Sequence, residues 1–398
     1  MNYGKIRAGV SGVGNDAIPY ANNNAGYTQS SISSGFGSIV PPFNSIPAYQ
    51  ISNTFGSNNL KPELTHSFEV GTDLSFLKDR LSFSFTYYNS LTHNLLTAVP
   101  LATSTGYAFE WENVGDISNK GEEVSLRWTP ISTKYGLRWD VFGTYTHNVN
   151  DVVSLTSGLD NVTVGGYNGM AIVAAVGHPF GTFYAADIQY WNGHPVVDAA
   201  TGLPIATAKP VYRGSYQPDF IASWGTQVTY KGLKLHALFT TKQGGEFFSR
   251  NKLDMDFNGT SQESTVNNRN PFVLPNSVNQ IGTTNNYVTN KTAMLPYDYY
   301  TNVEGNNLPA QGLVNASYVK LSELSLSYTI PQKYYKRTPF GTLEAGLFGN
   351  NLLLWTAPSN KYDDPSETSA GATSNGQGFN YTARPSLRNY GAFVKVTF

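Results

Sequence analysis

The chain has 398 residues, a formal net charge of -1 and no cysteine, which excludes a disulfide framework, a thiolate metal site and a cysteine nucleophile. Charged residues make up only 13% of the chain, against ~25% in typical soluble proteins, and aromatic residues make up 14%. The near-neutral charge without a basic cluster argues against a nucleic-acid partner. The notable apolar stretch, residues 170–176, is far shorter than the ~20 residues of a membrane-spanning helix.

Alternation of apolar and polar residues predicts β-strands along the whole chain. Residues 3–14 form a first predicted strand, and an Asn/Ser/Gly/Pro-rich stretch follows to about residue 60. The next strands are predicted in pairs that short turns join, and the strand after residue 318 changes face near Ser322–Glu323, which indicates a bulge. The paired strands cover residues 66–76 with 81–87, 124–130 with 137–145, 220–230 with 233–239, and 318–330 with 343–347.

A last strand covers residues 387–398, so ten strands are predicted, and residues 150–218 must add none or two. Long loops, among them one through Trp111, alternate with short turns. This alternation is typical of an antiparallel transmembrane β-barrel, with short turns in the periplasm and long loops outside. Irregular loops of this length are uncommon in compact soluble domains. The sequence therefore predicts an all-β barrel in the outer membrane, with the terminal strand ending on the periplasmic side.

Several segments resemble one family. Residues 59–63, 68–71 and 86–89 resemble the barrel of TonB-dependent outer-membrane receptors, and Asn113–Val124 resembles the N-G-E-I-x-N-K-G-x-E segment of their SusC/RagA branch. Further segments similar to that branch are residues 177–184, 318–328, 349–355 and 362–365. The resemblance implies that residues 1–398 are the C-terminal half, about 10–12 strands, of a barrel of roughly 22 strands. It also implies that the signal peptide, TonB box and plug domain are absent from this chain.

The function implied by this resemblance is energised import of a bulky nutrient, a glycan or a peptide, across the outer membrane. The implied partners are a SusD-like surface lipoprotein and, through the missing N-terminal part, TonB–ExbB–ExbD; transport by this chain alone is not expected. Two alternatives remain open at this point. One is a passive small porin or structural barrel, which conductance would reveal, and the other is a secreted β-sheet carbohydrate-binding module, which would be soluble without detergent.

No catalytic, cofactor or metal site is predicted. The six histidines are scattered, and His147 with Asp151 is the nearest approach to a metal-ligand spacing. Asp363–Asp364 beside Glu367 can be interpreted as calcium ligands, but Asp-Asp-Pro is more typical of a turn. Adjacent strand residues point to opposite faces, so Glu122 and Glu123 cannot act as a carboxylate pair.

Two sets of residues are candidates for contacts. Four aromatic residues expected in extracellular loops, Phe109, Trp111, Tyr190 and Trp191, are predicted to contact substrate; the alternative is anchoring at the membrane interface, as expected for Trp128, Trp139 and Trp224. The terminal strand, with Tyr390, Val394, Val396 and Phe398 on one face, resembles the signal that the barrel-assembly machinery reads.

Overall fold

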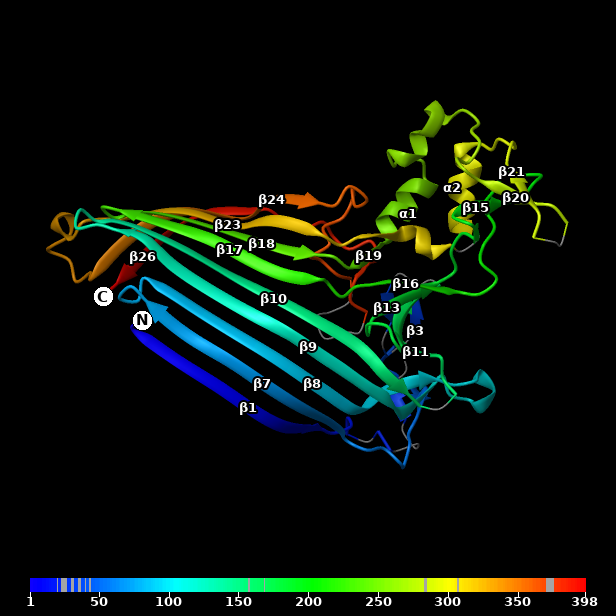
Figure 1. Ribbon diagram of the computed structural model, residues 1–398, viewed down its shortest axis with the longest axis horizontal. Coiled ribbons are helices and arrows are strands. Elements are labelled where there is room, and N and C mark those ends of the chain that lie inside the picture. The colour runs from blue at the N-terminus through cyan, green and yellow to red at the C-terminus, as the bar shows by residue number, and fades with distance from the viewer. Residues whose placement is uncertain are drawn as a thin grey trace.

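A computed structural model describes the chain except residues 20, 23–26, 30–31, 35–36, 40, 43, 157, 168, 283–284, 306–307 and 370–375. Ten long strands form one antiparallel sheet in the order β1-β7-β8-β9-β10-β17-β18-β23-β24-β26 (Figure 1). Within the described residues β1 and β26 each pair on one side only, so the sheet is an open wall. The strands are β1 (Tyr3–Asn15), β7 (Glu63–Phe76), β8 (Leu81–Pro100), β9 (Phe109–Ser132), β10 (Leu137–Leu155), β17 (Phe220–Tyr230), β18 (Leu233–Gln243), β23 (Tyr318–Thr329), β24 (Thr342–Thr356) and β26 (Asn389–Thr397).

The wall has an apolar and a polar face, as period-2 alternation requires. One face exposes large apolar side chains, among them Trp128, Trp224 and Leu326. The opposite face carries ion pairs such as Arg7 Nη1 to Asp73 Oδ2, 2.5 Å, and Arg138 Nη2 to Asp140 Oδ1, 2.8 Å. A lipid-facing exterior and a polar interior account for this division.

Aromatic rings on the polar face lie over glycines of the neighbouring strand. A Cβ added at Gly225 would stand 2.5 Å from the ring of Phe142, and one added at Gly346 would stand 2.8 Å from the ring of Phe393. Glycine in a strand leaves backbone that a neighbouring aromatic ring can cover. This packing explains why bulky Phe393 lies on the otherwise small and polar face of the last strand.

Short turns join the predicted strand pairs. The connection between β17 and β18 is the pair Lys231–Gly232, with φ of 48° and 91°, as a two-residue hairpin turn with positive φ at both positions requires. The predicted bulge is confirmed by a register shift between Leu321 and Glu323.

The predicted long loop through Trp111 is wrong. Strand β8 continues to Pro100 and β9 already begins at Phe109, so only residues 101–108 connect them. The pairing extends through Thr97 opposite Glu112 and Ala98 opposite Trp111, with irregular register near Leu95. The sequence did not indicate this because residues 95–100 of β8 are mostly apolar without alternation, and the register is irregular where the two strands continue past Thr92.

The true long loops fold into small sheets and helices at the end of the wall opposite to the two termini (Figure 1). The described residues between β10 and β17 add no strand to the wall, and the weak strand pair expected within 170–190 belongs to a separate four-stranded sheet, β11-β12-β13-β16. No described helix has the length and apolar character needed to cross a membrane. The smaller elements are β2 (Tyr27–Gln29), β3 (Ile32–Ser34), β4 (Gly37–Ile39), β5 (Tyr49–Ile51), β6 (Thr54–Phe55), η1 (Thr103–Thr105), β11 (Asn161–Tyr167), β12 (Met170–Ala175), β13 (Thr182–Ala185), β14 (Tyr190–Trp191), β15 (His194–Val197), β16 (Val211–Ser215), β19 (Glu246–Ser249), α1 (Arg250–Phe257), η2 (Glu263–Arg269), β20 (Val278–Gln280), β21 (Tyr287–Thr289), α2 (Pro296–Gly305), η3 (Pro309–Gly312), β22 (Leu313–Asn315), η4 (Gln332–Tyr334) and β25 (Phe379–Asn380).

The loop elements have their own hydrophobic core. Met170 and Phe183 from the four-stranded sheet pack with Phe248, Leu253 and Phe379, and all five side chains are buried. Since these residues come from three different loops, the loops form one packed body and not separate flexible segments.

Candidate functional site

A cavity of about 680 Å³ lies between the loop-side ends of β8 and β9 and the hairpin of β11 and β12. The hairpin is held against the polar face of the wall because Ile117 and Val152 of the wall pack against Ala174. The cavity is therefore on the inner side of the wall, at its outer end. Its lining residues are Thr97, Ala98, Phe109, Trp111, Thr163, Val164, Gly165, Gly166, Tyr167, Gly169, Met170 and Ala171.

Three aromatic residues contribute to this lining. Phe109 and Trp111 lie at the start of β9. Tyr167 lies at the tip of the hairpin, and the centroid of its ring is 3.9 Å from that of Tyr381. Glycines at 165, 166 and 169 leave part of the hairpin side of the cavity without side chains. Ligand pockets typically combine such apolar surfaces with a few backbone hydrogen-bonding groups.

Two of the four predicted aromatic residues line this cavity, and the other two, Tyr190 and Trp191, lie outside it. Phe109 and Trp111 line the same cavity, in a strand and not in the expected loop. Trp191 instead stacks on Tyr287, with ring centroids 4.6 Å apart, and burial raises the pKa of the neighbouring Tyr190. The sequence reasoning missed Tyr167, although a tyrosine inside the segment Gly165–Gly169 is a signal for an aromatic residue at a hairpin tip.

The candidate assembly residues lie on the outer face of β26. Tyr390 is 78%, Val394 68% and Phe398 90% exposed, whereas Val396 is half-buried opposite Leu343. The ring of Phe398 meets that of Phe340 edge-on, with centroids 5.5 Å apart. These residues form one apolar strip along an unpaired strand edge of the described sheet.

The acidic residues of the last loop hold the loop in place. Asp363 accepts hydrogen bonds from Ser249, Asn251 and Asn380, and the carboxylate of Asp364 lies 2.8 Å from Lys320 Nζ. Burial alone would raise the pKa of Asp364, but hydrogen bonds from Lys320 and Ser366 outweigh it and lower that pKa. No group of three or more potential metal ligands is found among the described residues. His147 contacts the backbone oxygen of Asp219.

A second contact joins two loops. Glu263 accepts from Lys361 Nζ at 2.7 Å and from the hydroxyl of Tyr362 at 2.5 Å, and its backbone oxygen accepts from Tyr300. Burial alone would raise the pKa of Glu263, but the bonds from Lys361 and Tyr362 lower it from 4.5 to about 2. An ion pair between Glu263 and Lys361 therefore joins the two loops, and the carboxylate of Glu263 stays ionised in mildly acidic solution.

A model of the family described as TonB dependent receptor-like, beta-barrel matches residues 17–235. The chain belongs to the TonB-dependent receptor β-barrel family. The predicted resemblance, the antiparallel barrel architecture and the outer-membrane location are thereby confirmed, and a receptor barrel of this family is not an enzyme.

Known relatives point to the same branch of TonB-dependent receptors. TonB-dependent receptor P3 of Formosa agariphila is 25% identical over 76% of this chain and 30% of its own length, and TonB-dependent receptor SusC of Bacteroides thetaiotaomicron is 31% identical over 35% of this chain and 15% of its own length. The structure of the RagAB peptide transporter matches 99% of this chain and 41% of its own chain, with 19% identity and a TM-score of 0.69. The chain thus spans about a third of the length of the relatives that match most of it.

Proposed function

We propose that this chain supplies wall strands and extracellular recognition loops to a TonB-dependent transporter that imports a bulky nutrient, a glycan or a peptide. The family and the similarity to SusC and to the RagAB peptide transporter support this function. The observation that carries it is the aromatic cavity with Phe109 and Trp111 on the inner side of the wall, where a ligand on its way into the barrel would be held. Membership of the family favours this function over a passive porin and a secreted binding module.

In this proposal residues 1–398 are the C-terminal half of a larger barrel. The open edges of β1 and β26 would pair with strands of the remaining receptor, since unpaired backbone groups are costly in lipid. The plug and TonB box would lie in that remaining part and couple the barrel to TonB–ExbB–ExbD, and a SusD-like lipoprotein would cover the loops. Nutrient uptake by the receptor in cells should therefore stop when TonB is deleted and persist if the barrel is a passive pore.

Replacing Trp111 by alanine in the receptor is expected to weaken nutrient binding at least tenfold, because central buried aromatic residues contribute about 2 kcal/mol or more to recognition. Equilibrium binding of the nutrient to the detergent-solubilised receptor measures this effect. Trp355→Ala is the matched control, because Trp355 is about half exposed on β24, outside the cavity. An unchanged affinity of the Trp111→Ala receptor would contradict a role of Trp111 in ligand binding. The double variant Tyr190→Ala with Trp191→Ala tests the second predicted pair in the same assay.

We also propose that Tyr390, Val394, Val396 and Phe398 are read by the barrel-assembly machinery. Their support is the exposed apolar strip along β26. Deleting Phe398 is expected to reduce the amount of heat-modifiable, membrane-inserted barrel several-fold, whereas Phe340→Ala, which removes only its ring partner, should reduce it less. Equal amounts of inserted barrel with and without Phe398 would contradict this role.

A further inference from the structure

The four short turns of the wall lie at the same end of the molecule as the two termini (Figure 1). They consist of residues 77–80, 133–136, 231–232 and 330–341. These ranges contain seven lysines and arginines, of which two are in the first turn, one is in each of the next two and three are in the last. Asp79 is their one acidic residue. Since the whole chain has a formal net charge of -1, the basic excess is a local property of the turns.

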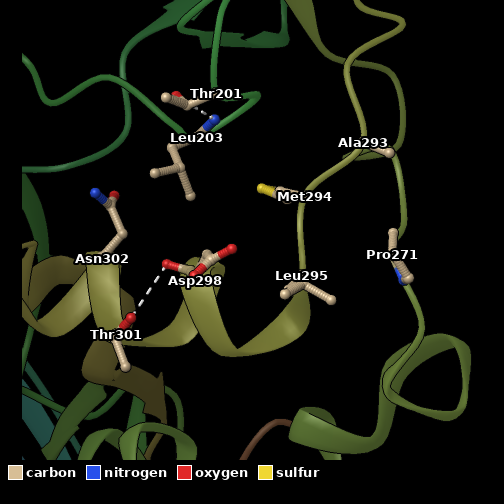
Figure 2. A pocket seen from close by; sticks show the side chains of 9 residues that line it. All are labelled: Thr201, Leu203, Pro271, Ala293, Met294, Leu295, Asp298, Thr301 and Asn302. Atoms are coloured by element: carbon tan, nitrogen blue, oxygen red, sulfur yellow. Dashed lines mark hydrogen bonds between the residues drawn. The ribbon is translucent and has the colours of Figure 1, made fainter.

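The charges of the turns are not neutralised within the chain. None of the seven bases forms an ion pair with an acidic residue in the described part of the structure. In the loop body, by contrast, Arg213 is paired with Asp187 at 3.1 Å. Of the nine residues that Figure 2 shows around the hollow beside α2, only Asp298 is charged. The turn end is therefore basic, and the loop end does not share this excess.

Each turn also places a base next to an exposed aromatic or aliphatic side chain. Nζ of Lys231 lies 5.2 Å from the centroid of the Tyr230 ring, and Nζ of Lys333 lies 4.8 Å from that of Tyr334. A ring beside a cationic group on an apolar stem is typical of the boundary between lipid and water. The four pairs of neighbours are Leu77 with Lys78, Lys134 with Tyr135, Tyr230 with Lys231, and Lys333 with Tyr334.

Rings on the apolar face of the wall set the level of these turns relative to the lipid. Trp128, Trp139, Tyr230 and Tyr328 lie on that face a few residues from a turn, and they are 37–45% exposed. Aromatic girdles of this kind mark the edge of the apolar band of an outer-membrane barrel. The turns lie directly beyond the rings, so their bases would stand at the level of the lipid head groups.

We propose that the four turns bind the head groups of acidic phospholipids, such as phosphatidylglycerol, in the leaflet at this end of the barrel. The ammonium and guanidinium groups would donate to phosphate oxygens, and the neighbouring rings would lie beside the upper part of the acyl chains. An acidic lipid surface attracts basic residues that lie close to it, and salt screens this attraction. The inference concerns the lipid-facing rim and is independent of the nutrient that the receptor imports.

The test places the intact receptor in bilayers of phosphatidylcholine and phosphatidylglycerol, with brominated acyl chains in one lipid at a time. Bromine quenches the fluorescence of tryptophans that the lipid contacts, and the part of the quenching that is lost in Trp128→Phe with Trp139→Phe reports on the turn end. Phosphatidylglycerol is expected to bind there at least about fivefold more tightly than phosphatidylcholine, the effect of one base near an acidic surface. Salt at about 0.5 M should reduce the preference. Equal quenching by the two lipids would overturn the proposal and favour an acidic periplasmic protein as the partner.

Lys231→Gln with Lys333→Gln is expected to lower the preference for phosphatidylglycerol several-fold, because two of the charges are removed. Lys231→Arg with Lys333→Arg keeps both charges and should keep the preference. The matched control is Lys209→Gln with Lys291→Gln, which removes two exposed lysines of the long loops. Heat-modifiable barrel formation, measured in parallel, shows that each variant is folded. A preference that the first double variant leaves unchanged, or that the control lowers equally, would contradict the assignment.

Discussion

Replacing Lys320 by methionine is expected to lower the free energy of unfolding by about 3–5 kcal/mol, the usual cost of leaving one member of a buried ion pair alone. The side chains of Lys320 and Asp364 are only 7% and 6% exposed, and their charged atoms are 2.8 Å apart. Lys320 belongs to β23, whereas Asp364 belongs to the loop before β26. The ion pair therefore holds that loop against the inner face of the wall. Urea unfolding of the receptor in lipid vesicles, read by tryptophan fluorescence, measures the change.

The double variant Lys320→Met with Asp364→Asn is the control for this result. It removes both charges, and Ser366 remains to bond the new amide, so most of the lost stability should return. A double variant as unstable as Lys320→Met would show that the lysine stem, and not the uncompensated carboxylate, causes the loss. Asp364→Asn alone leaves Lys320 buried and unpaired and should be nearly as harmful as Lys320→Met.

Acidification is expected to open the contact between Glu263 and the loop that carries Lys361 and Tyr362. The pKa of Glu263 is lowered in the folded protein to about 2 from 4.5, so ionised Glu263 stabilises the contact above pH 4.5. This contribution is lost as the pH falls from 4.5 toward 2, because the carboxyl group takes up a proton and no longer accepts from Lys361. Amide hydrogen exchange in residues 259–269 and 357–369, corrected for intrinsic pH effects, should rise across that window.

Glu263→Gln supplies the comparison for the acid response. The amide keeps the shape of Glu263 and cannot titrate, so the variant should show raised exchange in both segments already at pH 7 and little further change in acid. Tyr362→Phe removes one hydrogen bond and should show an intermediate effect. An acid response that persists in Glu263→Gln would assign it to another group.

The wall was predictable because its residues follow a local rule. Strands such as β7 and β18 alternate in the sequence as they do in the sheet, Lys231–Gly232 marks its turn, and the change of face at Ser322 marks its bulge. The rule fails where the end of β8 loses its alternation and its pairing becomes irregular, and for this reason Phe109 and Trp111 were assigned to a loop although they begin β9.

The candidate sites depend on contacts that no local pattern encodes. The aromatic cavity forms because β11 and β12 fold back onto the wall through Ile117 and Val152, and Tyr167 joins Phe109 in its lining only as a result. Likewise, Phe183 and Phe248 come from two different long loops and share one core only because these loops pack together.

The length of β9 sets the height of the aromatic cavity above the membrane. Trp111 and Trp128 stand at the two ends of this strand, which rises ~3.3 Å per residue and is tilted by roughly 40° in such barrels. Trp111 therefore lies about 40 Å above the level of Trp128, whereas the apolar band of an outer-membrane barrel is only about 25 Å tall. The rings of Phe109 and Trp111 are thus too high to anchor the protein at the lipid head groups. In the proposed function, these two rings would contact the ligand inside the receptor, above the level of the lipid surface.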